Sequence, residues 1–169
     1  MTISMYAASV PVLTQMLDSL SDVLHKAAAH AAAKNIAPEV LLQARLFPDM
    51  FPLLRQVQIA GDFAKGIAGR LAQTELPVYE DNEQTFADLQ TRIARTRDFI
   101  QSIKAADMAD SETLEIVLRP GTPKEQRLSG QNYLLHYGLP QFFFHITTAY
   151  DILRHAGVEL GKKDYMGRY

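Results

Sequence analysis

The segment "QFFFHITTAYDILRHAG", residues 141–157, sets one imidazole, His145, among apolar side chains. A histidine in such surroundings serves as a metal ligand, as a catalytic base or as a hydrogen-bonded part of the core. At 100° per residue of a helix, His145 falls on the apolar arc and faces inward. Gln141 precedes it by one turn and Thr148 follows on the same flank, so both side chains are placed to reach the imidazole.

A second polar side chain, Gln56, points at the predicted core from another helix, on the same face as Phe63 and Ile67. Burial without a partner costs such a group roughly 1 to 3 kcal/mol, so we expect Gln56, Gln141 and His145 to satisfy one another or to bridge through water. Three interpretations stay open: a structural polar network, a ligand pocket and a metal site. The metal site is least favoured, because carboxamide oxygens are poor ligands for Zn²⁺ or Ni²⁺.

Other groups capable of chemistry have simpler explanations. Four further histidines fall on polar helix faces, at helix edges or beside a proline: His25, His30, His136 and His155. Four carboxylates cluster where helices begin, so capping explains them: Asp49, Glu80, Asp81 and Glu83. If a metal were bound, His136 or Asp49 would be the candidate helpers of His145. The chain has none of the GxGxxG, P-loop, HExxH, GxSxG or CxxC patterns.

The composition favours one domain and excludes several partners. The 169 residues, 47% of them hydrophobic, suffice for one core, so we expect a single domain over residues 1–169. A net charge of −2, with no run of either sign, argues against nucleic acid as a partner. With no cysteine there is no disulfide or thiolate. Because the sequence lacks a secretory signal and any apolar stretch near the roughly 18 residues of a membrane span, we expect a cytoplasmic protein without membrane contact.

Helical spacing of apolar residues predicts the elements that must position these groups. A first helix covers residues 4–34, with an early bend at Pro11, and a short connecting helix follows over residues 38–46. A second long helix starts at Asp49 as its N-cap. A third covers residues 82–103, begins with a cap from Asp81 or Asn82, and is expected to expose Arg92, Arg95, Arg97 and Asp98.

After residue 103 the spacing of apolar residues changes from helical to alternating, and then becomes helical again. Residues 114–128 alternate around the turn signal "RPGTPK" and predict a small β-hairpin. A fourth long helix covers residues 129–156, with a kink at Pro140 and a stop at Gly157. The tail is expected to pack across one end of the molecule through Tyr165, Met166 and Tyr169. Four long amphipathic helices predict a mainly α protein, a four-helix bundle with a small β-hairpin between helices three and four.

Three stretches carry a resemblance to a known family: "FPDMFPLLRQVQIAGDFAKGIAGRL", "DNEQTFADLQTRIARTRDFI" and "LPQFFFHITTAYDILRHAGVELGKKDYMG". Over nearly its whole length the chain resembles an uncharacterised bacterial family that is a divergent branch of the DinB-like four-helix bundles. That group includes metal-dependent thiol transferases and putative hydrolases, and its members are often dimers. The resemblance therefore implies a DinB-like fold and a homodimer.

The resemblance also implies where a metal site would lie. In the usual DinB-like pattern, a histidine on helix two joins two histidines spaced HxxxH on helix four to hold a divalent metal. His145 is similar to the second of the helix-four histidines, because it comes eight residues before Leu153 of the Leu-Arg pair. Gln141 then stands at the first, and Gln56 of "LLRQ" stands at the helix-two position. Two of the three implied ligands are therefore carboxamides, which is typical of a degenerate metal site.

These observations lead to one expectation and two alternatives. We expect a metal-free module, without a cofactor, that binds a small ligand or is structural, with an inner polar pocket of Gln56, Gln141, His145 and Thr148. The first alternative is a metal-dependent thiol transferase or hydrolase that holds Zn²⁺ or Ni²⁺ with an altered ligand set. The second is a bundle that serves only in protein assembly through exposed apolar residues such as Phe143 and Phe144.

Overall fold

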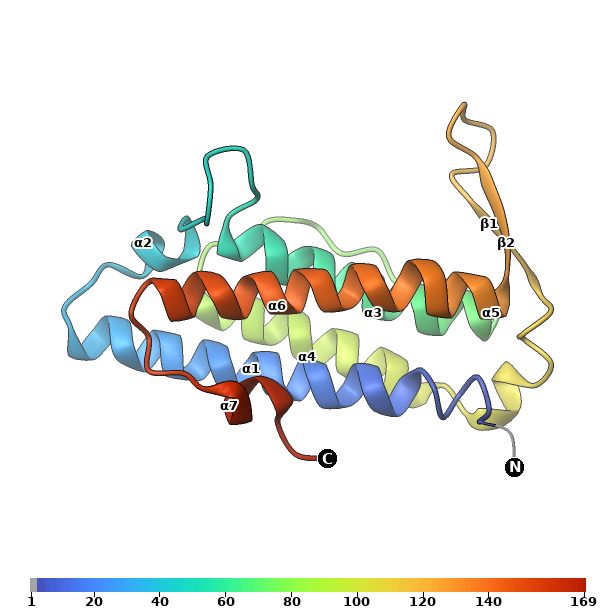
Figure 1. The fold of residues 1–169 in the computed structure, drawn as a ribbon, viewed down its shortest axis with the longest axis horizontal. Helices are drawn as coiled ribbons and strands as arrows, with labels where there is room; N and C mark the ends of the chain where they lie inside the picture. The colour runs from blue at the N-terminus through green and yellow to red at the C-terminus, as the bar shows by residue number, and fades with distance from the viewer. Residues whose placement is uncertain (1–2) are drawn as a thin grey trace.

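The computed structural model describes residues 3–169, which form four long helices, several short helical segments and one hairpin (Figure 1). The helical segments are α1 (Val10–Ala33), α2 (Pro38–Leu42), α3 (Leu53–Leu71), α4 (Phe86–Ser102), η1 (Ala105–Met108), α5 (Gly130–Asn132), η2 (Tyr133–Gly138), α6 (Leu139–His155) and α7 (Lys162–Met166). The strands are β1 (Glu115–Leu118) and β2 (Gln126–Ser129).

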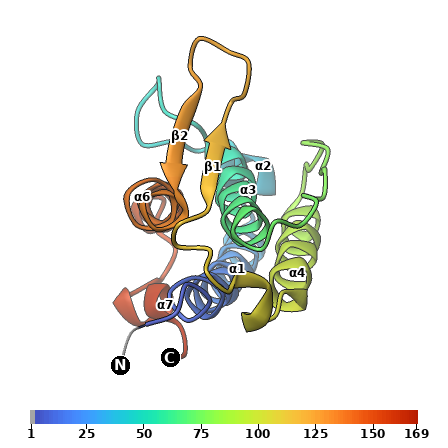
Figure 2. The ribbon, with the colours of Figure 1, turned by 90° about the vertical axis from the view of Figure 1, so that its right-hand side faces the viewer.

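The four long helices pack as a bundle around one apolar core. Viewed along the bundle, α3 lies between α4 and α6, while α1 closes the opposite side against α4 and α6 (Figure 2). The core is rich in leucine and alanine, and all four helices contribute to it, because each helix turns one apolar stripe inward. The predicted four-helix bundle with a small hairpin is confirmed. Within residues 3–169, no helix is both long enough and apolar enough to cross a membrane.

Three helix starts differ from the sequence predictions. Pro11 lies in the first turn of α1, where a missing N–H removes no helical hydrogen bond, so α1 begins there instead of bending. Pro52 takes the N-cap position of α3, which leaves Asp49 exposed in the preceding loop. Thr85 and Asp88 form a capping box at the start of α4, so neither Asp81 nor Asn82 caps that helix.

The predicted kink at Pro140 takes the form of a π-helical turn. Residues Tyr133–Gly138 are π-helical, and the N–H of Leu139 donates to the carbonyl of Leu134, five residues back. A proline cannot continue the ordinary i to i−4 ladder, and the wider turn absorbs that break. Gly138 ends the turn against α3, where an added Cβ would lie 2.7 Å from Ile67. The π turn therefore brings the chain very close to α3.

The hairpin projects from one end of the bundle beside α3 and α6 (Figures 1 and 2). Its strands are antiparallel, with Ile116 opposite Leu128 in the ladder. Ile116 and Leu118 are buried on one face of β1, whereas the alternate residues are more exposed. The hairpin predicted from the alternating sequence is therefore confirmed, and β1 ends next to η2.

The C-terminal tail packs along the side of α1 and not across an end of the bundle (Figure 1). Ser19 donates to the carbonyls of Asp164 and Tyr165 in α7, and Gln15 donates to the carbonyl of Met166. Tyr165 is half-buried and bonds Thr147 at 2.9 Å between the hydroxyl oxygens. Tyr169 is 98% exposed, so its predicted role as an anchor is wrong.

Arg92 is buried between α3 and α4, contrary to the prediction that it faces water. Its guanidinium lies 3.0 Å from carboxylate oxygens of Asp62 and Asp81 and 2.9 Å from Glu83. Two of these carboxylates come from the 80–83 segment before α4, which the structure folds over the helix. We call this group the Arg92 cluster.

Candidate functional site

The Gln56–His145 pair lies at the contact between α3 and α6 and consists of two buried polar side chains. Gln56 is 1% exposed and His145 is 7% exposed. Nδ1 of His145 lies 2.7 Å from Oε1 of Gln56, and the amide nitrogen of Gln56 donates to the carbonyl of Phe51 at 3.1 Å. The backbone carbonyl therefore fixes the amide so that its oxygen faces the imidazole.

This geometry determines which ring nitrogen of His145 carries the proton. A carboxamide oxygen only accepts hydrogen bonds, so Nδ1 must donate to Gln56 and Nε2 is left unprotonated. Burial lowers the pKa of His145 from 6.5 to about 4, and the positive charge of Arg55 acts in the same direction. Within residues 3–169, Nε2 has no hydrogen-bond partner and is not fully buried. His145 is thus neutral near pH 7 and presents an open acceptor.

The other predicted members of the inner pocket do not join this pair. The hydroxyl of Thr148 donates to the carbonyl of Phe144 at 2.7 Å, one turn back in α6. Gln141 is half-buried, and its side chain forms no hydrogen bond with residues 3–169. His136 and Asp49, the candidate helpers for a metal, are both exposed. Of the predicted four-member polar network, only the contact between Gln56 and His145 is formed.

Aromatic rings surround the imidazole of His145. Phe63 of α3 stacks on it, with ring centroids 5.8 Å apart and planes 16° apart, and Phe144 meets it edge-on at 5.3 Å. The ring of Phe63 also lies 6.0 Å from that of Tyr137, which precedes His145 by eight residues, about 12 Å along a helix at 1.5 Å per residue. Phe63 therefore separates the Gln56–His145 pair from the groups on η2.

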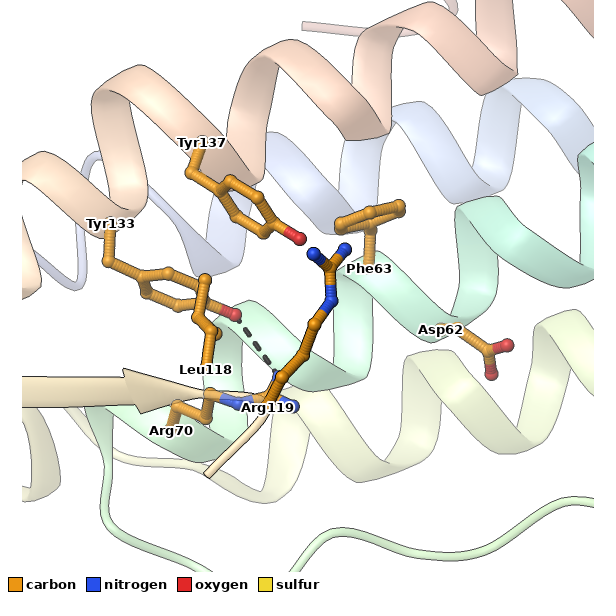
Figure 3. Close-up of a pocket in the computed structure, with 7 residues that line it drawn as sticks. All are labelled: Asp62, Phe63, Arg70, Leu118, Arg119, Tyr133 and Tyr137. Carbon is orange, nitrogen blue, oxygen red and sulfur yellow. Dashed lines mark hydrogen bonds between the residues drawn. The ribbon is translucent and has the colours of Figure 1, made fainter. Parts of the chain in front are cut away.

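Beyond Phe63 lies a pocket of about 230 Å³, between α3, η2 and the end of β1 (Figure 3). We call it the arginine–tyrosine pocket, and its lining residues are Asp62, Phe63, Arg70, Leu118, Arg119, Tyr133 and Tyr137. Nη1 of Arg70 donates to the hydroxyl of Tyr133 at 3.2 Å. The sequence predictions missed this pocket. The signal available was the i, i+4 spacing of Tyr133 and Tyr137, which places two phenols on one helix face just before a proline.

Comparison with known proteins identifies the family. The family model described as Domain of unknown function (DUF1993) matches residues 5–166. The chain belongs to this family. A crystal structure of a DinB family member protein from Shewanella denitrificans is 40% identical in sequence; the match covers 97% of this chain and 92% of that chain, with a TM-score of 0.91. The chain therefore has the DinB-like fold that its sequence resembles. No curated protein matched the sequence.

The residues at the implied three-histidine position do not fit a divalent metal. Both polar atoms of the Gln56 amide are engaged, the oxygen by His145 and the nitrogen by Phe51. Carboxamides are poor ligands for Zn²⁺ in any case, which leaves the imidazole of His145 as the single good donor among the three positions. Across residues 3–169, no group of three or more His, Cys, Asp and Glu side chains is placed to hold an ion.

Proposed function

We propose that this DUF1993 protein is a small-ligand-binding module in which Nε2 of His145 accepts a hydrogen bond from an uncharged ligand. One observation carries the proposal: Gln56 holds the imidazole in the Nδ1–H form, so that its free lone pair is on Nε2. An acceptor fixed in advance binds a donor without the cost of ordering its own side chain. The rings of Phe63 and Phe144 supply apolar contact for an aromatic or aliphatic part of the ligand.

An uncharged donor suits this position better than an ionic one. The surroundings that lower the pKa of His145 disfavour any added positive charge, and Arg55 adds to that effect. A carboxylate group has no hydrogen to offer to Nε2. Hydroxyl or neutral N–H donors therefore match the acceptor without an uncompensated buried charge.

The alternative is a metal-dependent thiol transferase or hydrolase with an altered ligand set. It would need further ligands beside His145, but His136 is nine residues away, which is roughly 13 Å along a helix at 1.5 Å per residue. Imidazole nitrogens lie about 2 Å from a bound metal, so these two histidines do not share one ion within a chain. Asp49 is exposed in the loop before α3. The geometry therefore favours the binding module.

A homodimer is also part of the proposal. Phe47, Phe51 and Phe144 are 63%, 55% and 56% exposed. Phe143, by contrast, is packed partly against the core. Exposed aromatic residues are enriched in protein interfaces, so they support the dimer and the weaker assembly-only interpretation alike.

Histidine NMR tests the open acceptor directly. In protein labelled with ¹⁵N at histidine, phenol, a neutral O–H donor on an aromatic ring, should shift the Nε2 resonance of His145 saturably. The four histidines His25, His30, His136 and His155 serve as internal controls and should not respond in the same way. A His145→Asn variant keeps an amide donor facing Gln56 but has no atom at the Nε2 position, so it should lose phenol binding.

The labelled protein and the His145→Asn variant also distinguish the ligand-binding module from the metal-dependent enzyme. Equal shifts at all five histidines, or unchanged phenol binding in His145→Asn, would contradict the acceptor role. Elemental analysis of protein purified without a chelator or a metal-affinity tag addresses the enzyme. About one tightly held transition metal per chain, lost in His145→Asn, would favour the metal-dependent enzyme.

A further inference from the structure

The arginine–tyrosine pocket gathers positive charge and hydrogen-bond donors on the far side of Phe63 from His145. Within residues 3–169, neither Arg70 nor Arg119 forms an ion pair with a carboxylate. The hydroxyl of Tyr133 accepts from Arg70, so its own hydrogen remains to be donated. Burial raises the pKa of Tyr133, which keeps that hydrogen in place near neutral pH.

The one carboxylate at this pocket is already compensated. Asp62 lies 3.0 Å from Arg92 of the Arg92 cluster and 3.0 Å from the Nζ of Lys65. In Figure 3 its carboxylate points away from the two tyrosines, whereas the Arg119 side chain extends toward Tyr137 and Phe63. The centre of the pocket is therefore positive, and its polar groups mostly donate.

The backbone holds Arg119 at the edge of this pocket. Arg119 follows the last residue of β1 directly and has a φ of 52°, a left-handed conformation that is uncommon for a residue other than glycine. Its carbonyl accepts from both the backbone N–H and the hydroxyl of Thr122, at 3.3 and 2.9 Å. The turn thus aims the arginine back at α3 instead of along the strand.

Gly66 makes room for the second arginine. A Cβ added at Gly66 would lie 2.5 Å from Nη1 of Arg70 and 3.7 Å from the hydroxyl oxygen of Tyr133. The guanidinium of Arg70 therefore occupies the space over the helix where any other residue would place its side chain. Arg119 from the turn after β1 and Arg70 from α3 therefore reach one small aromatic pocket.

We propose that the arginine–tyrosine pocket binds the carboxylate of a small aromatic acid, with Arg70, Arg119 and Tyr133 as the donors. Guanidinium groups match the two oxygens of a carboxylate in a planar, charge-assisted arrangement. Phe63 and Tyr137 pack on the ring of such a ligand. At about 230 Å³ the pocket is smaller than the roughly 300–1000 Å³ typical of ligand sites, which suits a single-ring acid and excludes a nucleotide. This binding goes beyond the neutral acceptor at His145, because Phe63 lies between the two.

Calorimetric titration with benzoate tests the site, with benzamide as the neutral ligand of the same shape. Benzoate should bind saturably, more weakly as salt is added, and benzamide should bind at least tenfold more weakly. Arg119→Gln should weaken benzoate about tenfold, which corresponds to about 1.4 kcal/mol. Arg119 is exposed at the end of the hairpin, so this change leaves the core intact. Lys124→Gln removes the same charge from the same turn, outside the pocket, and should alter binding less than twofold.

The outcomes separate this inference from the proposed function. Tyr133→Phe should weaken benzoate while phenol still shifts Nε2 of His145. Absence of saturable benzoate binding, equal binding of benzamide, or equal losses in Arg119→Gln and Lys124→Gln would overturn the carboxylate site. Each of these results leaves the phenol measurement at His145 to be judged by itself. Loss of the phenol shift with benzoate binding intact would reject the acceptor and keep the carboxylate site.

Discussion

Two polar centres are buried against α3, and they differ in charge and in hydrogen bonding. The Gln56–His145 pair, toward α6, is neutral and keeps one acceptor unpaired on Nε2. The Arg92 cluster, toward α4, is ionic, and the terminal nitrogens of Arg92 are surrounded by carboxylates and the carbonyl of Glu80. Within residues 3–169, Nε of Arg92 is buried without a hydrogen-bond partner, so the ionic centre is not fully paired either. The neutral centre offers its spare acceptor to a ligand, whereas the terminal nitrogens of Arg92 hold α4 to α3 and to the 80–83 segment.

The pKa shifts at the two centres express the same difference. At His145, burial removes the charge, because no group nearby compensates it and Arg55 opposes it. At Arg92, burial alone would lower the pKa, but the hydrogen bond that Arg92 donates to Glu83 and the charges of Asp62 and Asp81 raise it. A charge persists in this interior only where carboxylates accompany it.

The largest expected effect comes from breaking the ionic centre. Arg92→Met should lower the free energy of unfolding by about 3 kcal/mol, because it removes the ion pair of Glu83, whose side chain is only 9% exposed. Urea denaturation measures the loss. Arg97→Met on the same helix is the matched control, since its pair with Asp18 is exposed and worth under about 1 kcal/mol. Equal losses in both variants would show that the Arg92 cluster is not a buried centre.

The sequence predicted one of these centres and missed the other for a physical reason. His145 and Gln56 were found because helical periodicity decides which residues face inward, and periodicity depends only on the local chain. Arg92 lies near the polar edge of α4 in projection, and it is buried only because the 80–83 segment folds over it. The spacing of apolar residues within a helix does not indicate where a distant loop will pack.

The arginine–tyrosine pocket was missed for a related reason. Arg119 belongs to a turn signal in the sequence, and only the assembled hairpin brings it to α3 and η2. Pro140 correctly predicted a break in the last long helix, but the π turn that carries Tyr133 and Tyr137 is one of several ways to accommodate it. Nearly all of the fold could therefore be predicted from the sequence. Of the site, only the contact between Gln56 of α3 and His145 of α6 could be predicted.

An effect of similar size is a pH dependence at the neutral centre. The pKa of His145 is 6.5 when unperturbed and about 4 in the folded protein. Between these values the unfolded chain binds the extra proton, so stability is fully present above pH 6.5 and falls as the pH drops toward 4. The loss should reach about 3 kcal/mol. Urea denaturation at several pH values should show it as an excess over His145→Asn, which cannot titrate there; parallel curves for the two proteins would contradict it.

The smallest expected effect tests whether Thr148 belongs to a polar network with Gln56 and His145. Thr148 was expected to reach the imidazole, but its hydroxyl bonds the carbonyl of Phe144 within α6. Such a bond only duplicates a helical one, so Thr148→Val should change the free energy of unfolding by less than about 1 kcal/mol. The NMR titration of His145 should then give the same pKa as in the unaltered protein. A shifted pKa in this variant would return Thr148 to the polar centre and leave Nε2 less open than the Gln56–His145 geometry implies.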